Sequence, residues 1–195
     1  MRTAEIIRKT NETDIKLSLN IDGSGKAEID TGVGFLDHML TLFAVHGRFD
    51  LAVSCKGDVN VDDHHSVEDI GIALGQAFLQ AMGDKKGITR YASQWLPMDE
   101  ALVLCCTDIS GRGYLNYGLS IPSPKVGTFD TELVEEFFIA FCRNSGICLH
   151  LKQYDGRNSH HIIEAAYKAA GRALRQSFTV DKAFADEIPS SKGVL

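Results

Sequence analysis

Two stretches of this 195-residue chain decide its fold: His64-His65-Ser66-Val67-Glu68 and His160-His161-Ile162-Ile163-Glu164. Both follow the pattern His-His-x-x-Glu, and they are offset by 96 residues. The same offset relates four further pairs of identical residues: Lys56 and Lys152, Ala73 and Ala169, Gly75 and Gly171, and Ala77 and Ala173. A repeat of this length predicts that the chain is a duplicated half.

Local patterns predict the elements of the first half. Alternating apolar residues at 15–21 and 26–30, separated by the turn-forming residues 22–25, predict a β-hairpin. Apolar spacing then predicts a helix, a strand and a second helix, at residues 35–46, 49–54 and 66–82.

The second half repeats this order of elements. It predicts strands at 88–94, 100–108 and 114–119, a helix at 131–143, a strand at 147–153 and a helix at 161–177. We therefore expect an α+β fold in which each half is a small, mostly antiparallel sheet with two helices packed on one face. The expected units are residues 1–86 and 87–182 for the two repeats and residues 183–195 for a C-terminal tail.

Composition and charge narrow the class of protein. The chain is 44% hydrophobic with a formal net charge of −6, which argues against nonspecific binding to nucleic acid or to an anionic membrane. It has no apolar run of transmembrane length, and its N-terminus lacks the apolar core of a signal peptide. We expect a cytoplasmic protein.

Each His-His-x-x-Glu motif stands where a polar loop gives way to a predicted helix. The first His and the Glu are four residues apart, so they share one helix face, while the second His points elsewhere. A single His pair at a helix start is most often only polar capping, but the two copies hold four of the seven histidines. Imidazole and carboxylate donors without thiolate suit Mn²⁺, Fe²⁺ or Zn²⁺, so we expect a metal site.

Each motif offers at most three donors, so the site needs further ligands. His38 is the first candidate, because it follows a glycine-containing entry to a predicted helix. His46 is two helical turns later on a similar side and could line the same site. His150 lies inside a predicted strand and is interpreted as structural.

Cations in predicted loops and in the tail suggest a second kind of contact. Arg90, Arg112, Lys168 and the segment Ser190-Ser191-Lys192-Gly193 offer guanidinium, ammonium, hydroxyl and backbone N–H donors. Taken singly, each is most simply a solvated surface residue. Together they favour a phosphorylated substrate.

Long ordered motifs carry a family resemblance over nearly the whole chain. They are Arg8-x-Thr10-x-Glu12-Thr13, Gly34-Phe-Leu-Asp-His-Met-Leu40, Asp62-Asp-His-His-x-x-Glu-Asp-Ile70, Asp108-x-Ser-Gly-Arg-x-Tyr-Leu115, Phe129-Asp-Thr-Glu-Leu-Val-Glu-Glu-Phe-Phe138, Asn158-Ser-His-His-Ile-Ile-Glu164 and Pro189-Ser-Ser-Lys-Gly193. In these motifs the chain resembles the imidazoleglycerol-phosphate dehydratase family.

The resemblance implies a duplicated ribosomal S5 domain 2-like fold and a lyase of histidine biosynthesis. The implied reaction dehydrates D-erythro-imidazole-glycerol phosphate to imidazole-acetol phosphate with two Mn²⁺ ions per active site. The implied partners are further copies of the chain, in a homo-oligomer of twenty-four subunits with the sites at subunit interfaces, and neither nucleic acid nor a membrane.

The resemblance also implies roles for individual residues. The implied metal ligands are His38, His64, His65, Glu68, Glu136, His160, His161 and Glu164. The implied substrate contacts are Glu12, His46, Arg90, Arg112, Lys168, Ser190, Ser191 and Lys192. Glu12 and Glu164 are the candidates for the catalytic acid/base.

Glu136 departs from the pattern, because some family members have His at this position. Mn²⁺ accepts carboxylate ligands, so we expect the site to persist with Glu there.

Two other functions use similar donors. A dinuclear metal hydrolase would need a metal-bound water as its nucleophile. A non-catalytic metal-storage protein of the ferritin type would need Glu-x-x-His on long bundled helices, whereas this chain has His-His-x-x-Glu and many predicted strands.

Overall fold

The computed structural model describes residues 1–195 and shows two sheets of four strands each. The first sheet has the order β1-β2-β4-β3, and two helices accompany it. The elements of this half are β1 (Thr3–Lys9), β2 (Thr13–Asn20), β3 (Ala27–Asp30), α1 (Gly34–Gly47), β4 (Asp50–Gly57) and α2 (His64–Ala81).

The second sheet has the order β5-β6-β10-β7 and repeats the topology of the first. Its elements are β5 (Tyr91–Met98), β6 (Ala101–Asp108), β7 (Tyr114–Gly118), α3 (Leu133–Ser145), β10 (Cys148–Asp155) and α4 (Ser159–Ser177). In each sheet two strand pairings are antiparallel and one, β3 with β4 or β7 with β10, is parallel. The expected α+β fold with an internal duplication is therefore confirmed. A small ribbon of β8 (Lys125–Val126) and β9 (Phe129–Asp130) and a short 3-10 helix, η1 (Lys182–Phe184), complete the elements.

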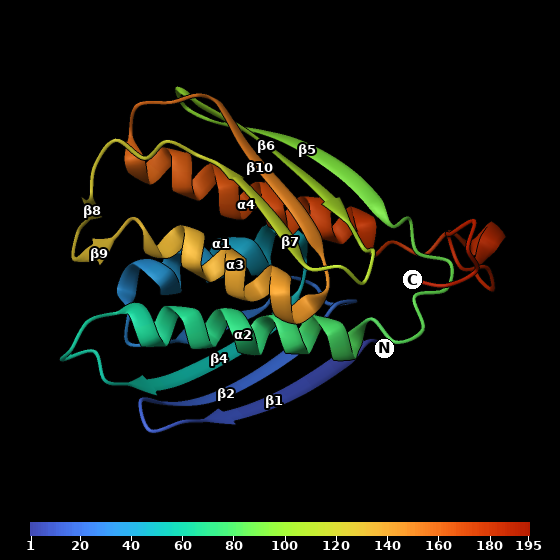
Figure 1. Cartoon of the computed structure of the whole chain (residues 1–195), viewed down its shortest axis with the longest axis horizontal. Coiled ribbons are helices and arrows are strands. Elements are labelled where there is room, and N and C mark those ends of the chain that lie inside the picture. Colours follow the sequence, from blue (N-terminus) through green and yellow to red (C-terminus); the bar gives the residue numbers. More distant parts are fainter.

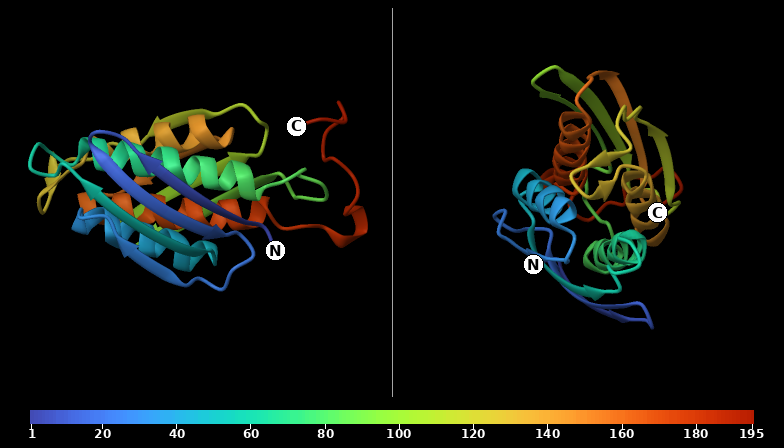
Figure 2. Two further views of the ribbon diagram at one scale, coloured as in Figure 1. Left: turned by 90° about the horizontal axis from the view of Figure 1, so that it is seen from below. Right: turned by 90° about the vertical axis from the view of Figure 1, so that its left-hand side faces the viewer.

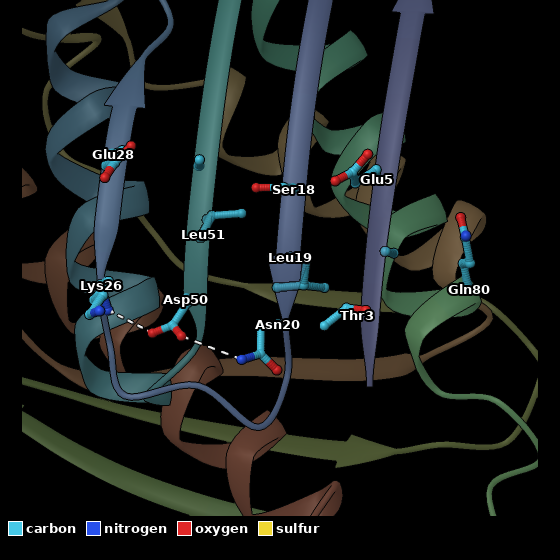
Figure 3. Close-up of a pocket in the computed structure, with 12 residues that line it drawn as sticks. Thr3, Glu5, Ser18, Leu19, Asn20, Lys26, Glu28, Asp50, Leu51 and Gln80 are labelled. Atoms are coloured by element: carbon cyan, nitrogen blue, oxygen red, sulfur yellow. Dashed lines mark hydrogen bonds between the residues drawn. The ribbon is translucent and has the colours of Figure 1, made fainter. Parts of the chain in front are cut away.

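The predicted hairpin between residues 15–21 and 26–30 is wrong. β4 lies between β2 and β3, and β2 forms its hairpin with β1, which the sequence patterns did not predict. Asp50, the first residue of β4, explains the geometry, because its Oδ1 accepts N–H groups from Ser24, Gly25 and Lys26. Figure 3 shows the contact with Lys26. These hydrogen bonds turn the segment after β2 across the end of β4, so β3 runs parallel to β4 on its far side.

The four helices lie between the two sheets, with α2 packed on α3 and α1 packed on α4 (Figure 1). Fifty buried residues from both halves form one hydrophobic cluster. Figure 2 shows the same layered arrangement end-on. The expected boundary between the repeats, at residues 86 and 87, falls in the turn that joins α2 to β5.

Glycines at matching positions of the repeat allow the helices to approach closely. A Cβ on Gly75 of α2 would lie 2.6 Å from the carbonyl oxygen of Phe141 in α3. A Cβ on Gly171 of α4 would lie 2.5 Å from the carbonyl oxygen of Phe43 in α1. The 96-residue repeat therefore includes the helix-crossing points as well as the histidine motifs.

The amino ends of α2 and α4 lie at one end of the molecule, and the C-terminal tail lies at the other (Figure 1, left and right). Both histidine motifs are consequently at the same end. None of the helices is long and apolar enough to cross a membrane.

Candidate metal centre

One group of metal-ligating side chains forms where α1 meets the start of α4. His38, His160 and Glu164 each offer a donor atom, and these atoms all lie within 4.8 Å of one another. Glu164 Oε2 lies 3.1 Å from His160 Nε2 and 3.4 Å from His38 Nε2. This is the arrangement that the i, i+4 spacing predicts for His160 and Glu164, joined by a third donor from another helix.

The backbone at the start of α4 holds its motif in place. Asn158 precedes the helix in an extended conformation, and its side-chain oxygen accepts the N–H groups of His160 and His161. Such a cap satisfies donors that the first helical turn otherwise leaves unpaired. Both histidines therefore project from a fixed first turn.

Glu164 is buried and paired with Lys168. Lys168 Nζ lies 2.5 Å from Glu164 Oε1 on the same face of α4. Burial acts to raise the pKa of Glu164, but the hydrogen bond and charge of Lys168 outweigh it and hold this pKa below its ordinary value. An ionised carboxylate thus presents its other oxygen, Oε2, to the two imidazoles.

His46 lies on the last turn of α1, near the same region. Burial, followed by the positive charges of Lys168 and Arg172, lowers the pKa of His46. His46 is therefore a neutral imidazole at pH 7, which can accept or donate a hydrogen bond.

The first motif, at the start of α2, is more open. His64 Nε2 lies 3.9 Å from Glu68 Oε2, and both side chains are exposed. His65 points to a different place: its Nδ1 lies 3.0 Å from Asp58 Oδ2, and its Nε2 lies 3.7 Å from Glu12 Oε1. The hydrogen bond to Asp58 raises the pKa of His65.

A buried carboxylate ties the turn that carries Glu12 to helix α2. Asp69 accepts from Arg8 through Oδ1, at 2.7 and 3.0 Å, and from the Thr13 hydroxyl through Oδ2, at 2.5 Å. Thr10 Oγ1 accepts the N–H groups of Glu12 and Thr13. Glu12 is thereby held above the first turns of α2.

His161 of the second motif has a matching environment. Its Nδ1 lies 2.7 Å from Glu100 Oε2, and its Nε2 lies 3.7 Å from Asp99 Oδ2. The hydrogen bond from His161, together with backbone N–H groups of Asn158 and Arg157, lowers the pKa of Glu100 to about 2. Sequence reasoning missed Asp58, Asp99 and Glu100, although Glu12 and Glu100 each directly precede the second strand of their half.

The remaining predicted ligands do not join the His38 group within one chain. His64, His65, Glu68, His161 and Glu136 all lie outside it, and no other group of three such donors is as close. Glu136 lies in the first turn of α3 and is half-buried. One chain thus brings together three of the eight predicted ligands.

The predicted phosphate-binding residues other than Lys168 lie at the opposite end of the molecule. The Arg90 backbone N–H donates to the carbonyl of Ser177, the last residue of α4. Arg90 Nε also lies 2.9 Å from Asp108 Oδ1, and its Nη1 donates to the carbonyl of Pro189. Arg90 is therefore fixed beside the tail, far from the histidines at the start of α4.

Arg112 and the tail residues belong to this same end. Arg112 is exposed in the turn after β6, and the neighbouring Gly111 lies against Leu195 at the chain end. The predicted contacts Ser190, Ser191 and Lys192 form a turn in which the Lys192 N–H donates to Ser190 Oγ. The structure thus brings Arg90 and Arg112 to the tail, while Lys168 and His46 stay near Glu164.

A prominent hollow of the surface does not coincide with either cluster. It has a volume of about 630 Å³ and lies on the outer face of the first sheet (Figure 3). Its lining contains no histidine and none of the predicted site residues. The chemistry of the donors, rather than the size of a hollow, therefore locates the candidate site.

Comparison with known proteins gives a consistent result. A family model described as imidazoleglycerol-phosphate dehydratase matches residues 31–174. The chain is 59% identical to the imidazoleglycerol-phosphate dehydratase of Jannaschia sp. (strain CCS1), over the full length of both. It is 57% identical to that of Synechococcus sp. (strain WH7803), covering 100% of this chain and 96% of the relative.

Two solved structures resemble the fold. The imidazoleglycerol-phosphate dehydratase of Staphylococcus aureus subsp. aureus N315 matches with a TM-score of 0.81 and 44% identity, covering 92% of this chain and 99% of that one. The Pyrococcus furiosus protein, solved in complex with (S)-C348, matches with a TM-score of 0.84 and 38% identity, covering 97% and 100%.

Proposed function

The chain belongs to the imidazoleglycerol-phosphate dehydratase family, and from this premise we propose that it uses two Mn²⁺ ions per site to dehydrate D-erythro-imidazole-glycerol phosphate. The product would be imidazole-acetol phosphate plus water. Family membership makes the chain an enzyme of the hydro-lyase class in histidine biosynthesis. The proposal comprises the metal, the specific substrate, the assembly and a cytoplasmic location.

The single observation that carries the metal proposal is the group formed by His38, His160 and Glu164. Two imidazoles and one ionised carboxylate converge within 4.8 Å, a donor set that suits Mn²⁺. The buried Glu164 carboxylate needs positive partners, and Lys168 satisfies only one of its oxygens. A cation beside Oε2 would complete the group.

The rest of the ligand set supports sites shared between copies of the chain. His64, His65, Glu68, His161 and Glu136 would supply the remaining donors, but one chain does not bring them to the first group. A neighbouring subunit can supply the missing donors if the histidine-bearing ends meet. This sharing of donors supports the proposed homo-oligomer, and the number of twenty-four subunits is what the family resemblance implies.

The separation of the basic residues supports the same assembly. Arg90, Arg112 and the tail would hold the substrate phosphate, as guanidinium and backbone N–H groups commonly do. They lie at the end of α4 opposite His160. The phosphate-binding end of one subunit would therefore face the histidine end of another.

The chain's own carboxylates would handle the protons. When bound, the metal ions would act as Lewis acids toward the substrate imidazole and the departing hydroxyl. Glu12 is half exposed and held by Thr10 and the Asp69 network above His65, so it can take the proton from the substrate carbon. The hydroxyl leaves with a second proton as water, which gives an enol. The enol then loses its O–H proton and gains a proton on the carbon that lost the hydroxyl, which gives the ketone of the product.

Metal analysis combined with a substrate assay tests the proposal. Glu12→Gln should keep the metal-to-protein ratio while turnover falls by orders of magnitude. His161→Ala should lower the metal content itself. Release of inorganic phosphate from the substrate, without the absorbance change of dehydration, would instead support the metal-dependent hydrolase.

A further inference from the structure

The second histidine of each motif is held by a carboxylate that no sequence motif identified. His65 Nδ1 lies 3.0 Å from Asp58 Oδ2 and 3.2 Å from Asp58 Oδ1. His161 Nδ1 lies 2.7 Å from Glu100 Oε2. Asp58 and Glu100 come from different places: the loop after β4 and the turn before β6. The two halves thus reach the same contact from unrelated positions.

We propose that Asp58 and Glu100 are positioning residues that make His65 and His161 bind metal through Nε2. The proposal rests on the metal site of the proposed function and extends it to residues outside the ligand set. A carboxylate beside Nδ1 accepts a hydrogen bond from the Nδ1–H group. The neutral imidazole must then have its lone pair on Nε2. Such a contact also fixes the ring orientation and increases the basicity of the free nitrogen.

The contacts of Glu100 make its effect on the orientation of His161 stronger than the effect of Asp58 on His65. Its Oε1 accepts the backbone N–H groups of Asn158, at 2.8 Å, and Arg157, at 3.2 Å. Only Oε2 is left for His161, so the side chain has one possible orientation. Asn158 also caps α4. Glu100 therefore fixes the His161 ring relative to the helix that bears it.

The Asp58 carboxylate forms its hydrogen bonds with His65 alone, so no other hydrogen bond fixes its orientation. Its backbone N–H donates to the carbonyl of Glu12, and this contact is independent of the carboxylate. An asparagine at position 58 could turn its carbonyl oxygen toward Nδ1 and keep the same tautomer. A glutamine at position 100 could not, because the two backbone N–H groups require its oxygen and leave its NH₂ group facing His161 Nδ1.

The carboxylates at equivalent places in the two halves, Glu12 and Glu100, have different roles. Glu12 and Glu100 each directly precede the second strand of their half. Glu100 occupies Nδ1 of its histidine, whereas Glu12 faces the Nε2 side of His65 at 3.7 Å. Because Asp58 holds His65, Glu12 is available for proton transfer. In the second half, the turn carboxylate is committed to positioning.

The test is a Mn²⁺ titration of the metal-stripped full-length protein, with free Mn²⁺ followed by electron paramagnetic resonance. Glu100→Gln should weaken the binding of at least one ion by about 10–100-fold, the usual effect of losing such an outer contact. Asp58→Asn should weaken it less. Asp155→Asn is the matched control, because this carboxylate lies at the same sheet end but its side chain contacts only its neighbour Gly156. The control should bind Mn²⁺ like the parent.

His161→Ala distinguishes a failure of the positioning role from a failure of the ligand set. If it loses Mn²⁺ while Glu100→Gln and Glu100→Ala both bind like the parent, the positioning role is overturned and the ligand set stands. If His161→Ala itself keeps full affinity, the ligand set of the proposed function fails. The circular dichroism spectrum of the metal-free Glu100→Gln protein at the titration temperature should match that of the parent, and a weakened affinity in such a folded variant supports the positioning role.

Discussion

The backbone N–H of Arg90 donates to the carbonyl of Ser177, which fixes Arg90 at the end of α4 opposite His160. Ser177 lies seventeen positions after His160 in this helix, a length of about 26 Å at 1.5 Å per residue. The proposed substrate, D-erythro-imidazole-glycerol phosphate, would have its phosphate only a few bonds from its imidazole ring. Residues at the two ends of one α4 helix therefore cannot hold both parts of one substrate molecule.

This separation predicts complementation between inactive variants. Glu12→Gln removes a carboxylate at the histidine end, and Arg112→Ala removes a cation at the tail end whose side chain makes only a 3.4 Å contact with Ser110. Each variant alone should have little activity. Co-assembled in equal amounts, they should recover about a quarter of the parent activity, because sites that combine two intact ends form at random. Absence of recovery in a verified mixed assembly would place both ends of a site in one chain.

Glu136 predicts a graded response to substitution. Glu136→Ala should lower the affinity for Mn²⁺, because a donor is lost. Glu136→His should retain it, because imidazole and carboxylate are both accepted by this metal. Calorimetric titration with Mn²⁺ measures both variants. Equal affinity in parent and Glu136→Ala would remove Glu136 from the ligand set.

The helix-crossing glycines predict position-specific destabilisation. Gly75→Ala and Gly171→Ala would each press a methyl group against backbone atoms of a facing helix. Such overpacking should cost about 1–3 kcal/mol in the free energy of unfolding. Gly34→Ala is the control, because nothing lies within 4 Å of its Cβ position. Denaturant unfolding would contradict the interpretation if all three variants matched the parent.

Asp50 predicts a stability contribution with a defined pH window. Backbone N–H groups of Ser24, then Lys26, lower its pKa from 3.8 to about 2. A lowered folded-state pKa means that the contribution is complete above pH 3.8 and is lost as the pH falls toward 2. The difference in unfolding free energy between the parent and Asp50→Asn should therefore be constant from pH 7 to pH 5 and shrink below pH 3.8. Paired urea titrations measure it, and a difference that grows on acidification would contradict this role.

Apolar periodicity and the internal repeat correctly predicted the helices and strands that bury one face. The helices at α1 to α4 and the duplicated α+β topology follow from apolar spacing and the 96-residue offset. The pairing of β2 with β4 could not be predicted in the same way, since it depends on Asp50 capturing three backbone N–H groups of a distant loop. β1 was missed because side chains such as Ile7 are exposed, which weakens its alternating pattern.

The candidate site, like the fold, could be predicted only in part from the sequence. The i, i+4 contact between His160 and Glu164 follows from helix geometry alone. The approach of His38 does not, because it depends on how α1 packs against α4. Asp58 and Glu100 were missed because they lie outside both motifs and reach His65 and His161 only in the folded chain.

The length of helix α4 fixes the distance between the histidine end and the tail end of each subunit. Each residue added to it would lengthen the spacing between its two ends by about 1.5 Å and rotate one end against the other by about 100°. An insertion or deletion within residues 159–177 would thus misalign the histidine end and the tail end at once. The span of this helix therefore sets the spacing with which any shared site must agree.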